Sequence, residues 1–347
     1  MSSPSIIHAK RLVEVSVKAL TAVGVKIDEA HIVADHLVDA NLTGYHSHGI
    51  ARLPIYVEGI KKGLMVSGVS PEVVKESAAT ALLDCKFLLG PVAVENAFQM
   101  AAKKASEAGI GCVSTLNATY AARLGLYVEQ VASNGKIAIM TANDGGSFPA
   151  VAPWNSVQAF LSTNPIAAGI PRGPDIAPII IDIATASTAR GKLNLKYQAG
   201  EKDAPPGILI GKDGKEESSL SAFFQDSSAA ILPLGGFIAG HKGFALSLLV
   251  DVLSGALGGT GCSSGKMTGK ENSGVFCLVI NPEFFGTREQ FVNHVEKLIA
   301  GIKSCPPVPG QNEILIPGER LSRARKETLE TGILLSPEDW KIVNKYS

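Results

Sequence analysis

The chain has 347 residues, with 32 lysines and arginines against 32 aspartates and glutamates, and 46% of its residues are hydrophobic. The hydrophobic fraction excludes a disordered chain. The zero net charge argues against nucleic acid or an anionic membrane as the main partner, because both attract clustered positive charge.

Helices are predicted over the N-terminal segment 5–63. Apolar residues recur at helical spacing from Ala30 to Ala40, with Asp28 as the N-cap and Gly44 as the stop. From residue 80 onward, short β-branched runs alternate with Gly, Pro, Asn and Asp clusters, which is the pattern of strands and turns. We predict strands at 80–83, 112–115, 136–141, 166–170, 178–183 and 275–280, and helices at 93–108, 244–257, 288–303, 320–331 and 337–345.

The helical character of both chain ends predicts two domains. Residues 1–118 and 300–347 are predicted to form a helix-rich domain, and 119–299 an inserted one. The longest apolar run, 244–257, is too short for a membrane span and carries Asp251. No Gly-x-Gly-x-x-Gly follows a strand and opens a helix, so a Rossmann dinucleotide site has no support in the sequence.

The cysteines indicate the compartment. All five are scattered, and none forms a Cys-x-x-Cys pair, which is typical of thiols in a reducing compartment rather than of disulfides or a zinc site. The first twenty residues contain no apolar leader. The sequence predicts a soluble, cytoplasmic protein with no membrane partner.

The densest polar cluster surrounds His48 and Arg52. Ser47 can cap a helix that begins at His48, which would place His48 and Arg52 one turn apart on one face. Such a pair suits catalysis, because a guanidinium grips a carboxylate while an imidazole exchanges a proton. The alternative is an ordinary capped helix start. His46 and His48 as metal ligands have less support, since no acidic third ligand lies nearby.

Two further segments carry candidate site residues. Asp182 ends an apolar strand before small hydroxyl residues, a position found both in active sites and in ordinary turns. Lys242 and Gly243 precede the apolar helix 244–257, and free backbone N–H groups at a helix N-terminus can bind a cofactor phosphate. An ordinary helix start explains that segment equally well.

Together, these segments resemble the type-2 malate/L-lactate dehydrogenase family, which also includes ureidoglycolate and sulfolactate dehydrogenases and a cyclic imino-acid reductase. The resemblance runs essentially end to end. It is carried by Ala34-Asp35-His36-Leu37, Ser47-His48-Gly49-Ile50-Ala51-Arg52-Leu53-Pro54-Ile55-Tyr56, Thr163-Asn164-Pro165-Ile166-Ala167, Asp182-Ile183-Ala184-Thr185-Ala186, Leu232-Pro233-Leu234-Gly235-Gly236, Lys242-Gly243 and Ile316-Pro317-Gly318-Glu319.

The resemblance implies an α/β (α+β), non-Rossmann fold with a predominantly antiparallel sheet in the cofactor domain. It implies a homodimer that uses NAD or NADP. His48 and Arg52 would lie in the substrate pocket beside Ser47, with Arg52 facing a carboxylate, and Asp182 would lie by the nicotinamide. The other residues implied to lie near the cofactor are Asn143, Asp144, Thr163, Asn164, Pro165, Thr185, Lys242, Gly243, Pro317, Gly318 and Glu319.

The chain departs from the family pattern after Asn117. The proton-accepting histidine of the family falls on Tyr120, and a phenol is a poor base at neutral pH but a competent proton donor. Arg123, about one turn later, would favour the phenolate. Asp144 stands where the family commonly has Ser or Thr, and Ser162 replaces a glycine.

The expected reaction is hydride transfer between a nicotinamide and a small 2-oxo or 2-hydroxy acid, with malate and oxaloacetate as the first substrate pair. Arg52 would hold the carboxylate, and Tyr120 or His48 would supply the proton, with Asp182 orienting or charging the imidazole. One alternative is a reductase of cyclic imino acids or a ureidoglycolate-type dehydrogenase of the same fold. The other is a nicotinamide-binding protein that has lost turnover, because the family's histidine is Tyr120. No metal is expected.

Overall fold

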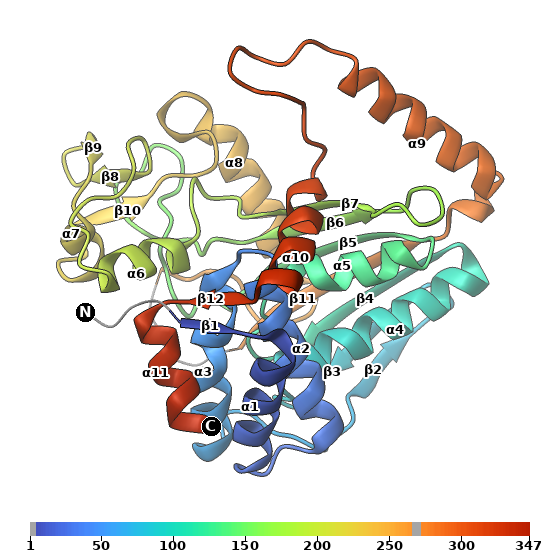
Figure 1. Ribbon diagram of the computed structural model, residues 1–347, viewed down its shortest axis with the longest axis horizontal. Coiled ribbons are helices and arrows are strands. Elements are labelled where there is room, and N and C mark those ends of the chain that lie inside the picture. Colours follow the sequence, from blue (N-terminus) through green and yellow to red (C-terminus); the bar gives the residue numbers. More distant parts are fainter. Residues whose placement is uncertain (1–4, 266–271) are drawn as a thin grey trace.

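The computed structural model describes residues 5–265 and 272–347 (Figure 1). Its helices are α1 (Ala9–Thr21), α2 (Ile27–Leu42), α3 (Leu53–Lys61), α4 (Gly90–Ala108), α5 (Leu124–Ser133), α6 (Arg190–Gln198), α7 (Leu220–Phe224), α8 (Gly236–Asp251), α9 (Arg288–Lys303), α10 (Glu319–Thr331) and α11 (Pro337–Tyr346). Its strands are β1 (Ser5–Ile7), β2 (Glu72–Glu76), β3 (Thr80–Asp84), β4 (Ile110–Leu116), β5 (Ile137–Asn143), β6 (Ile166–Ile170), β7 (Ile179–Ile183), β8 (Leu209–Gly211), β9 (Glu216–Glu217), β10 (Ala229–Ile231), β11 (Gly274–Ile280) and β12 (Ile333–Leu335).

A seven-stranded sheet in the order β2-β3-β4-β11-β5-β6-β7 forms the centre of the molecule. Within it only β3 and β4 run parallel, and every other neighbouring pair is antiparallel. The predicted mixed, predominantly antiparallel fold is therefore confirmed. The sheet joins strands from both predicted domains, and the domain boundaries at 118 and 300 stay a prediction.

Helices cover both faces of this sheet. Successive side chains of a strand point to opposite faces, and β5 shows which helix lies on which side. Ala138 pairs with Gly169, over which α5 packs so closely that a Cβ on Gly169 would lie 2.2 Å from the carbonyl oxygen of Val128. Thr141 points the other way and lies 2.7 Å from Ser254 Oγ, in the π-helical turn Val252–Ala256 that continues α8. The cavity described below opens at the end of β5.

The two ends of the chain come together beside the sheet. β1 pairs antiparallel with β12, and α11 packs on α1 and on the short turn Ile50–Arg52 (Figure 1). A second, smaller region holds α6, α7 and the three-stranded sheet β10-β8-β9, with its own hydrophobic core around Leu209, Leu220 and Ile231. No helix or strand of this region was predicted from the sequence.

Helix α8 begins at Gly236 rather than at the predicted residue 244, with a kink at Ala239 (φ −130°, ψ 17°). The helical stretch Gly236–Ala256 therefore reaches 21 residues with a mean hydropathy of 1.4, and 28% of its most apolar window is buried. By length and composition alone it can cross a membrane, which corrects the prediction that no apolar segment is long enough. This property is shared by core helices of soluble proteins. Its buried face carries Asp251, which hydrogen-bonds Asn143 at 2.8 Å.

Candidate active site

A cavity of about 370 Å³ opens between the start of α3, the loop before α5, the end of β5 and the start of α6. It brings Tyr120 into one space with His48 and Arg52, two predicted site residues that lie far from it in the sequence. Its lining consists of His48, Arg52, Ile55, Tyr120, Ala121, Ala122, Leu124, Ala142, Asn143, Asp144, Ser147, Phe148, Ala150, Ser162, Thr163, Pro165, Ala189, Arg190, Gly191, Asn194 and Ser273.

Two 3-10 turns, His46–His48 and Ile50–Arg52, place His48 and Arg52. The predicted helix from His48 with Ser47 as its cap is wrong. The regular helix starts at Leu53. The segment before it is held against α2, where Asn41 Oδ1 accepts the backbone N–H of Ile50 at 2.7 Å. Pro54 lies in the first turn of α3, where its missing donor costs nothing.

His48 is an uncharged base in this setting. Its Nδ1 lies 3.0 Å from the Ser47 hydroxyl, and the ring is largely enclosed. Burial lowers the pKa of His48 to about 4, and the positive charges of Arg52, Arg123 and Lys192 act in the same direction. At neutral pH the imidazole is therefore a neutral hydrogen-bonding group rather than a cationic acid.

Tyr120 reaches the cavity from a tightly held loop. Its carbonyl oxygen accepts the Tyr56 hydroxyl at 3.2 Å, and a Cβ on Gly90 would lie 2.0 Å from that same oxygen, so only glycine fits at the start of α4. The Tyr120 ring centroid lies 6.4 Å from that of His48 and 5.9 Å from Arg52 Cζ. The three side chains thus surround one small volume.

Arg52 points its guanidinium end toward the cavity. Its Nε donates to the carbonyl oxygen of Ser47 at 2.6 Å, which fixes the orientation of the fork. Ser47 itself is buried and does not line the cavity. It therefore supports the two neighbouring functional side chains, and its predicted contact with substrate stays a prediction.

Asp182 lies behind the cavity wall rather than in its lining. Its Oδ2 accepts the backbone N–H of Gly125 at 2.9 Å, in the first turn of α5, and lies 3.4 Å from Arg123 Nε. A carboxylate at a helix N-terminus is stabilised by the unpaired N–H groups there. Burial raises the pKa of Asp182, and Arg123 and Gly125 counter part of that rise. Arg123 faces two carboxylates, so the prediction that it acts on Tyr120 gains no support.

Four of the residues implied to bind the cofactor line the cavity: Asn143, Asp144, Thr163 and Pro165. The Asp144 carboxylate accepts backbone N–H groups of Gly146 at 3.0 Å and Phe148 at 3.2 Å. Burial raises its pKa, and a hydrogen bond from Ser162 lowers it. Two departures from the family pattern, Asp144 and Ser162, therefore contact each other.

Asn164 and Thr185 lie fully buried directly behind that lining. Thr185 Oγ1 donates to the Asn164 carbonyl at 2.9 Å, and Asn164 Nδ2 donates to Ser247 Oγ at 3.1 Å. Within the described residues, Asn164 Oδ1 has no hydrogen-bond partner. These two residues connect the cavity wall to the buried face of α8.

The remaining implied cofactor residues lie outside the cavity lining. Lys242 is exposed inside α8, and Gly243 allows α8 to approach Leu234, whose backbone N would lie 2.4 Å from an added Cβ. Pro317 and Gly318 hold the edge of the sheet, where the Pro317 carbonyl accepts Ile180 N–H at 3.0 Å. Glu319 pairs with Lys303 at 2.7 Å. Their predicted roles at the cofactor stay predictions.

Arg190 and Asn194 of α6 are lining residues that the sequence did not reveal. The Arg190 guanidinium lies 5.7 Å from the Phe148 ring centroid and 5.8 Å from that of Phe224. Burial lowers its pKa, and Arg52 adds to that effect. The basic run Arg190-Gly191-Lys192, shortly after Asp182, was the available sequence signal for an anion-binding residue. It gave no indication that Arg190 shares a cavity with Arg52.

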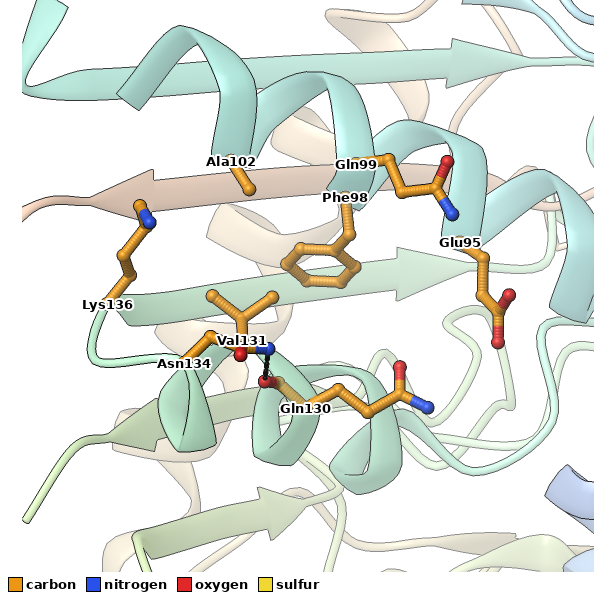
Figure 2. A pocket seen from close by; sticks show the side chains of 8 residues that line it. All are labelled: Glu95, Phe98, Gln99, Ala102, Gln130, Val131, Asn134 and Lys136. Atoms are coloured by element: carbon orange, nitrogen blue, oxygen red, sulfur yellow. Dashed lines mark hydrogen bonds between the residues drawn. The ribbon is translucent and has the colours of Figure 1, made fainter. Parts of the chain in front are cut away.

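A second cavity, of about 270 Å³, lies between α4 and α5 (Figure 2). Phe98 and Val131 point into it, and Glu95 and Lys136 lie at its opposite ends. It holds no counterpart of the His48, Arg52 and Tyr120 group. Within residues 5–265 and 272–347, no three His, Cys, Asp or Glu side chains lie together as a metal site would require.

Known proteins resemble this chain over nearly its whole length. The malate/L-lactate dehydrogenase family model matches residues 7–344. The malate dehydrogenase of Pyrococcus horikoshii is 38% identical over 93% of this chain and 89% of its own length. Its solved structure superimposes with a TM-score of 0.88 over 99% of this chain and 94% of that one, at 34% identity.

Two further relatives act on other acids by their names. The L-sulfolactate dehydrogenase of Methanocaldococcus jannaschii is 37% identical over 90% of this chain and 89% of its own length. The structure of delta1-piperideine-2-carboxylate reductase from Pseudomonas syringae has a TM-score of 0.82 at 27% identity, covering 99% of this chain and 100% of that one.

Proposed function

Because the chain belongs to the malate/L-lactate dehydrogenase family, we propose that it is a nicotinamide-dependent dehydrogenase that interconverts malate and oxaloacetate. One observation favours a substrate with two anionic groups: two guanidinium groups, those of Arg52 and Arg190, line the same cavity. Each can bind a carboxylate in a bidentate manner. A substrate with two anionic groups fits this pair better than lactate or pyruvate, which have one.

The cavity also suits a nicotinamide cofactor. Its lining includes the polar residues Ser147, Ser162 and Thr163 and the apolar residues Ala142 and Pro165. The buried Asn164 Oδ1 behind this wall has no partner among the described residues. When bound, the nicotinamide supplies or accepts a hydride at the substrate carbon. We propose that the nicotinamide ring of NAD or NADP binds beside these residues.

Three side chains then act on the substrate, each in a different role. Arg52, oriented by its bond to Ser47, grips the carboxylate next to the reacting carbon. Tyr120 donates its hydroxyl proton to the substrate oxygen in reduction and accepts it back in oxidation. His48, uncharged at neutral pH, is a poor proton source and serves as a neutral hydrogen-bond partner in the same space.

Absorbance of NADH and NADPH, followed with oxaloacetate, pyruvate, 3-sulfopyruvate and a cyclic imino acid in turn, tests the proposal. Oxidation of either cofactor with oxaloacetate at the highest kcat/KM supports it. Preference for the cyclic imine would favour the piperideine-carboxylate reductase alternative, and preference for sulfopyruvate the sulfolactate one. Binding of the reduced cofactor without turnover on any acid would identify a lapsed enzyme.

Arg190→Gln is expected to raise KM for oxaloacetate about 10- to 100-fold, because one of two charge-assisted contacts is lost. KM for pyruvate should stay within about twofold, since a monocarboxylate needs only Arg52. Steady-state kinetics on both acids measures the difference. Lys196→Gln, on the outer part of α6, is the matched control and should change neither value. An equal rise of KM for oxaloacetate and for pyruvate would contradict the proposal that Arg190 binds the second carboxylate.

We further propose that a second copy of this chain covers α8. Ile238, Leu249 and Val252 form an exposed apolar stripe at helical spacing, with exposed fractions of 93%, 50% and 54%. Contiguous apolar patches of this kind mark interaction surfaces. The opposite face of the same helix holds Asn143 and Asn164 of the cavity wall through Asp251 and Ser247. A partner on α8 would thereby stabilise the cavity.

We also propose a cytoplasmic location.

Ile238→Asp is expected to convert a dimer into a single chain of 36.2 kDa, because a charge in an apolar interface is left unpaired. Light scattering coupled to size exclusion measures the mass. Leu298→Asp, which changes an exposed leucine of α9, should leave the dimer intact. A wild-type protein that runs as one chain, or that pellets with lipid vesicles, would contradict a second copy as the partner of α8.

A further inference from the structure

Arg123 is a buried guanidinium held between two carboxylates. It is 2% exposed, its Nη1 lies 2.6 Å from Asp39 Oδ2 on α2, and its Nε lies 3.4 Å from Asp182 Oδ2 on β7. Its Cζ lies 4.8 Å from the ring centroid of Tyr45. Asp39 is shared with Arg325 of α10, at 2.8 Å. One side chain therefore ties the loop before α5 to α2 and β7.

The loop that Arg123 anchors is the one that carries Tyr120. Ala122, directly before Arg123, has φ +60°, in the left-handed region that an L residue adopts only under constraint. Tyr120, Ala121 and Ala122 all line the cavity. Gly125 completes the arrangement, since a Cβ there would lie 2.5 Å from Arg123 Nη2 and 2.7 Å from Asp182 Oδ2.

We infer that Arg123 is a positioning residue: by binding Asp182 and Asp39 it holds the strained Tyr120 loop against the cavity, and its positive charge acts on the His48 imidazole. Asp182, the carboxylate expected to charge an imidazole at the site, is instead bound by Arg123 and the start of α5. The positive charges that act on His48 are those of Arg52 in the following turn, Arg123 in this loop and Lys192 of α6. Tyr120 and Ser47 are its other polar neighbours.

The titration of His48 tests the electrostatic part without any substrate. NMR of protein labelled with ¹³C at histidine Cε1 follows each imidazole, and the resonance missing from His48→Gln identifies residue 48. In the wild type we expect a midpoint of about 4. Arg123→Met should raise it, because a positive charge is removed and Asp182 is left uncompensated. Asp182→Asn should leave it at or below the wild-type value.

The opposite signs separate this role from a merely structural one. Both substitutions break the same ion pair and lower stability, so a structural role predicts that the two variants change His48 alike. An unmoved midpoint in Arg123→Met, or a raised midpoint in Asp182→Asn, overturns the inference. If Arg123→Met does not fold, the Asp182→Asn titration still decides. Arg325→Met removes the outer arginine of the cluster and should leave the His48 midpoint unchanged.

The inference that Arg123 holds the Tyr120 loop rests on the proposed function, and steady-state kinetics tests it. Arg123→Met should lower kcat about tenfold or more while KM stays within about threefold, because Tyr120 is displaced and Arg52 is not. Arg325→Met should change neither value by more than about threefold. A loss confined to KM would overturn this part. Absence of activity in the wild type would overturn the proposed function alone, since the titration needs no turnover.

Discussion

Replacing Tyr120 with phenylalanine is expected to lower kcat for oxaloacetate reduction by about 10³-fold and to leave KM within about threefold, because a proton donor contributes to the transition state and little to binding. The geometry supports Tyr120 as that donor. Its ring shares the cavity with His48 and Arg52, and the pKa of His48, lowered to about 4, leaves the imidazole without an acidic proton at neutral pH. Steady-state kinetics at saturating reduced cofactor measures the effect.

The matched variant is His48→Gln, which keeps a hydrogen-bonding side chain of similar length. It should cost about tenfold or less if His48 only orients the substrate. A large loss of kcat in His48→Gln together with a small one in Tyr120→Phe would reverse the two roles. A solvent isotope effect on kcat that is present in the wild type and absent from Tyr120→Phe would add independent support.

The second large effect is expected at Arg52, where Arg52→Gln should lower kcat/KM for oxaloacetate by about 10³-fold, since both charge-assisted bonds to a carboxylate are lost. The bond from Arg52 Nε to the Ser47 carbonyl orients the fork before substrate arrives. Arg52→Lys should recover less than about a tenth of the activity, because an ammonium lacks the planar fork. Kinetics and circular dichroism of both variants measure activity and folding.

A well-folded Arg52→Gln that retains most of its kcat/KM would show that Arg190 alone binds the carboxylates. Added guanidinium ion offers a further check. It should restore part of the activity of Arg52→Gly, in which a space is left beside Gly191, and should leave the Arg190→Gln variant unchanged.

Much of the central sheet was predictable because its signals are local. The strand at 166–170 was predicted with its observed bounds, and those at 136–141 and 275–280 nearly so, since these apolar segments lie between turn residues. The helix at 288–303 likewise matched α9, which a capping box at Thr287 begins. In contrast, β8, β9 and β10 have two or three residues each, too few for a periodic signal.

The start of α8 was missed for a different reason. Gly235 and Gly236 have positive φ, which is typical of turns, and no helix was predicted over them. The helix nevertheless begins at Gly236. At the site, motif residues such as His48 and Arg52 were predictable, but their partners were not. Arg190 lies close enough to feel the charge of Arg52 only because the fold places α6 beside the cavity. Asp182 pairs with Arg123 only because β7 packs beside the loop that precedes α5. Contacts of this kind depend on tertiary packing, which a single sequence does not encode locally.

The order of strands in the sheet also sets an order of events during synthesis. β4 and β5 lie close in the chain, yet β11 is inserted between them and pairs with both. Two inner edges thus remain open until the chain has been made through Ile280, roughly ten seconds or more at ordinary elongation rates. Exposed strand edges recruit other strands. The nascent chain should therefore depend on chaperones through that interval, and release of a chain cut before β11 should yield aggregates rather than a smaller folded unit.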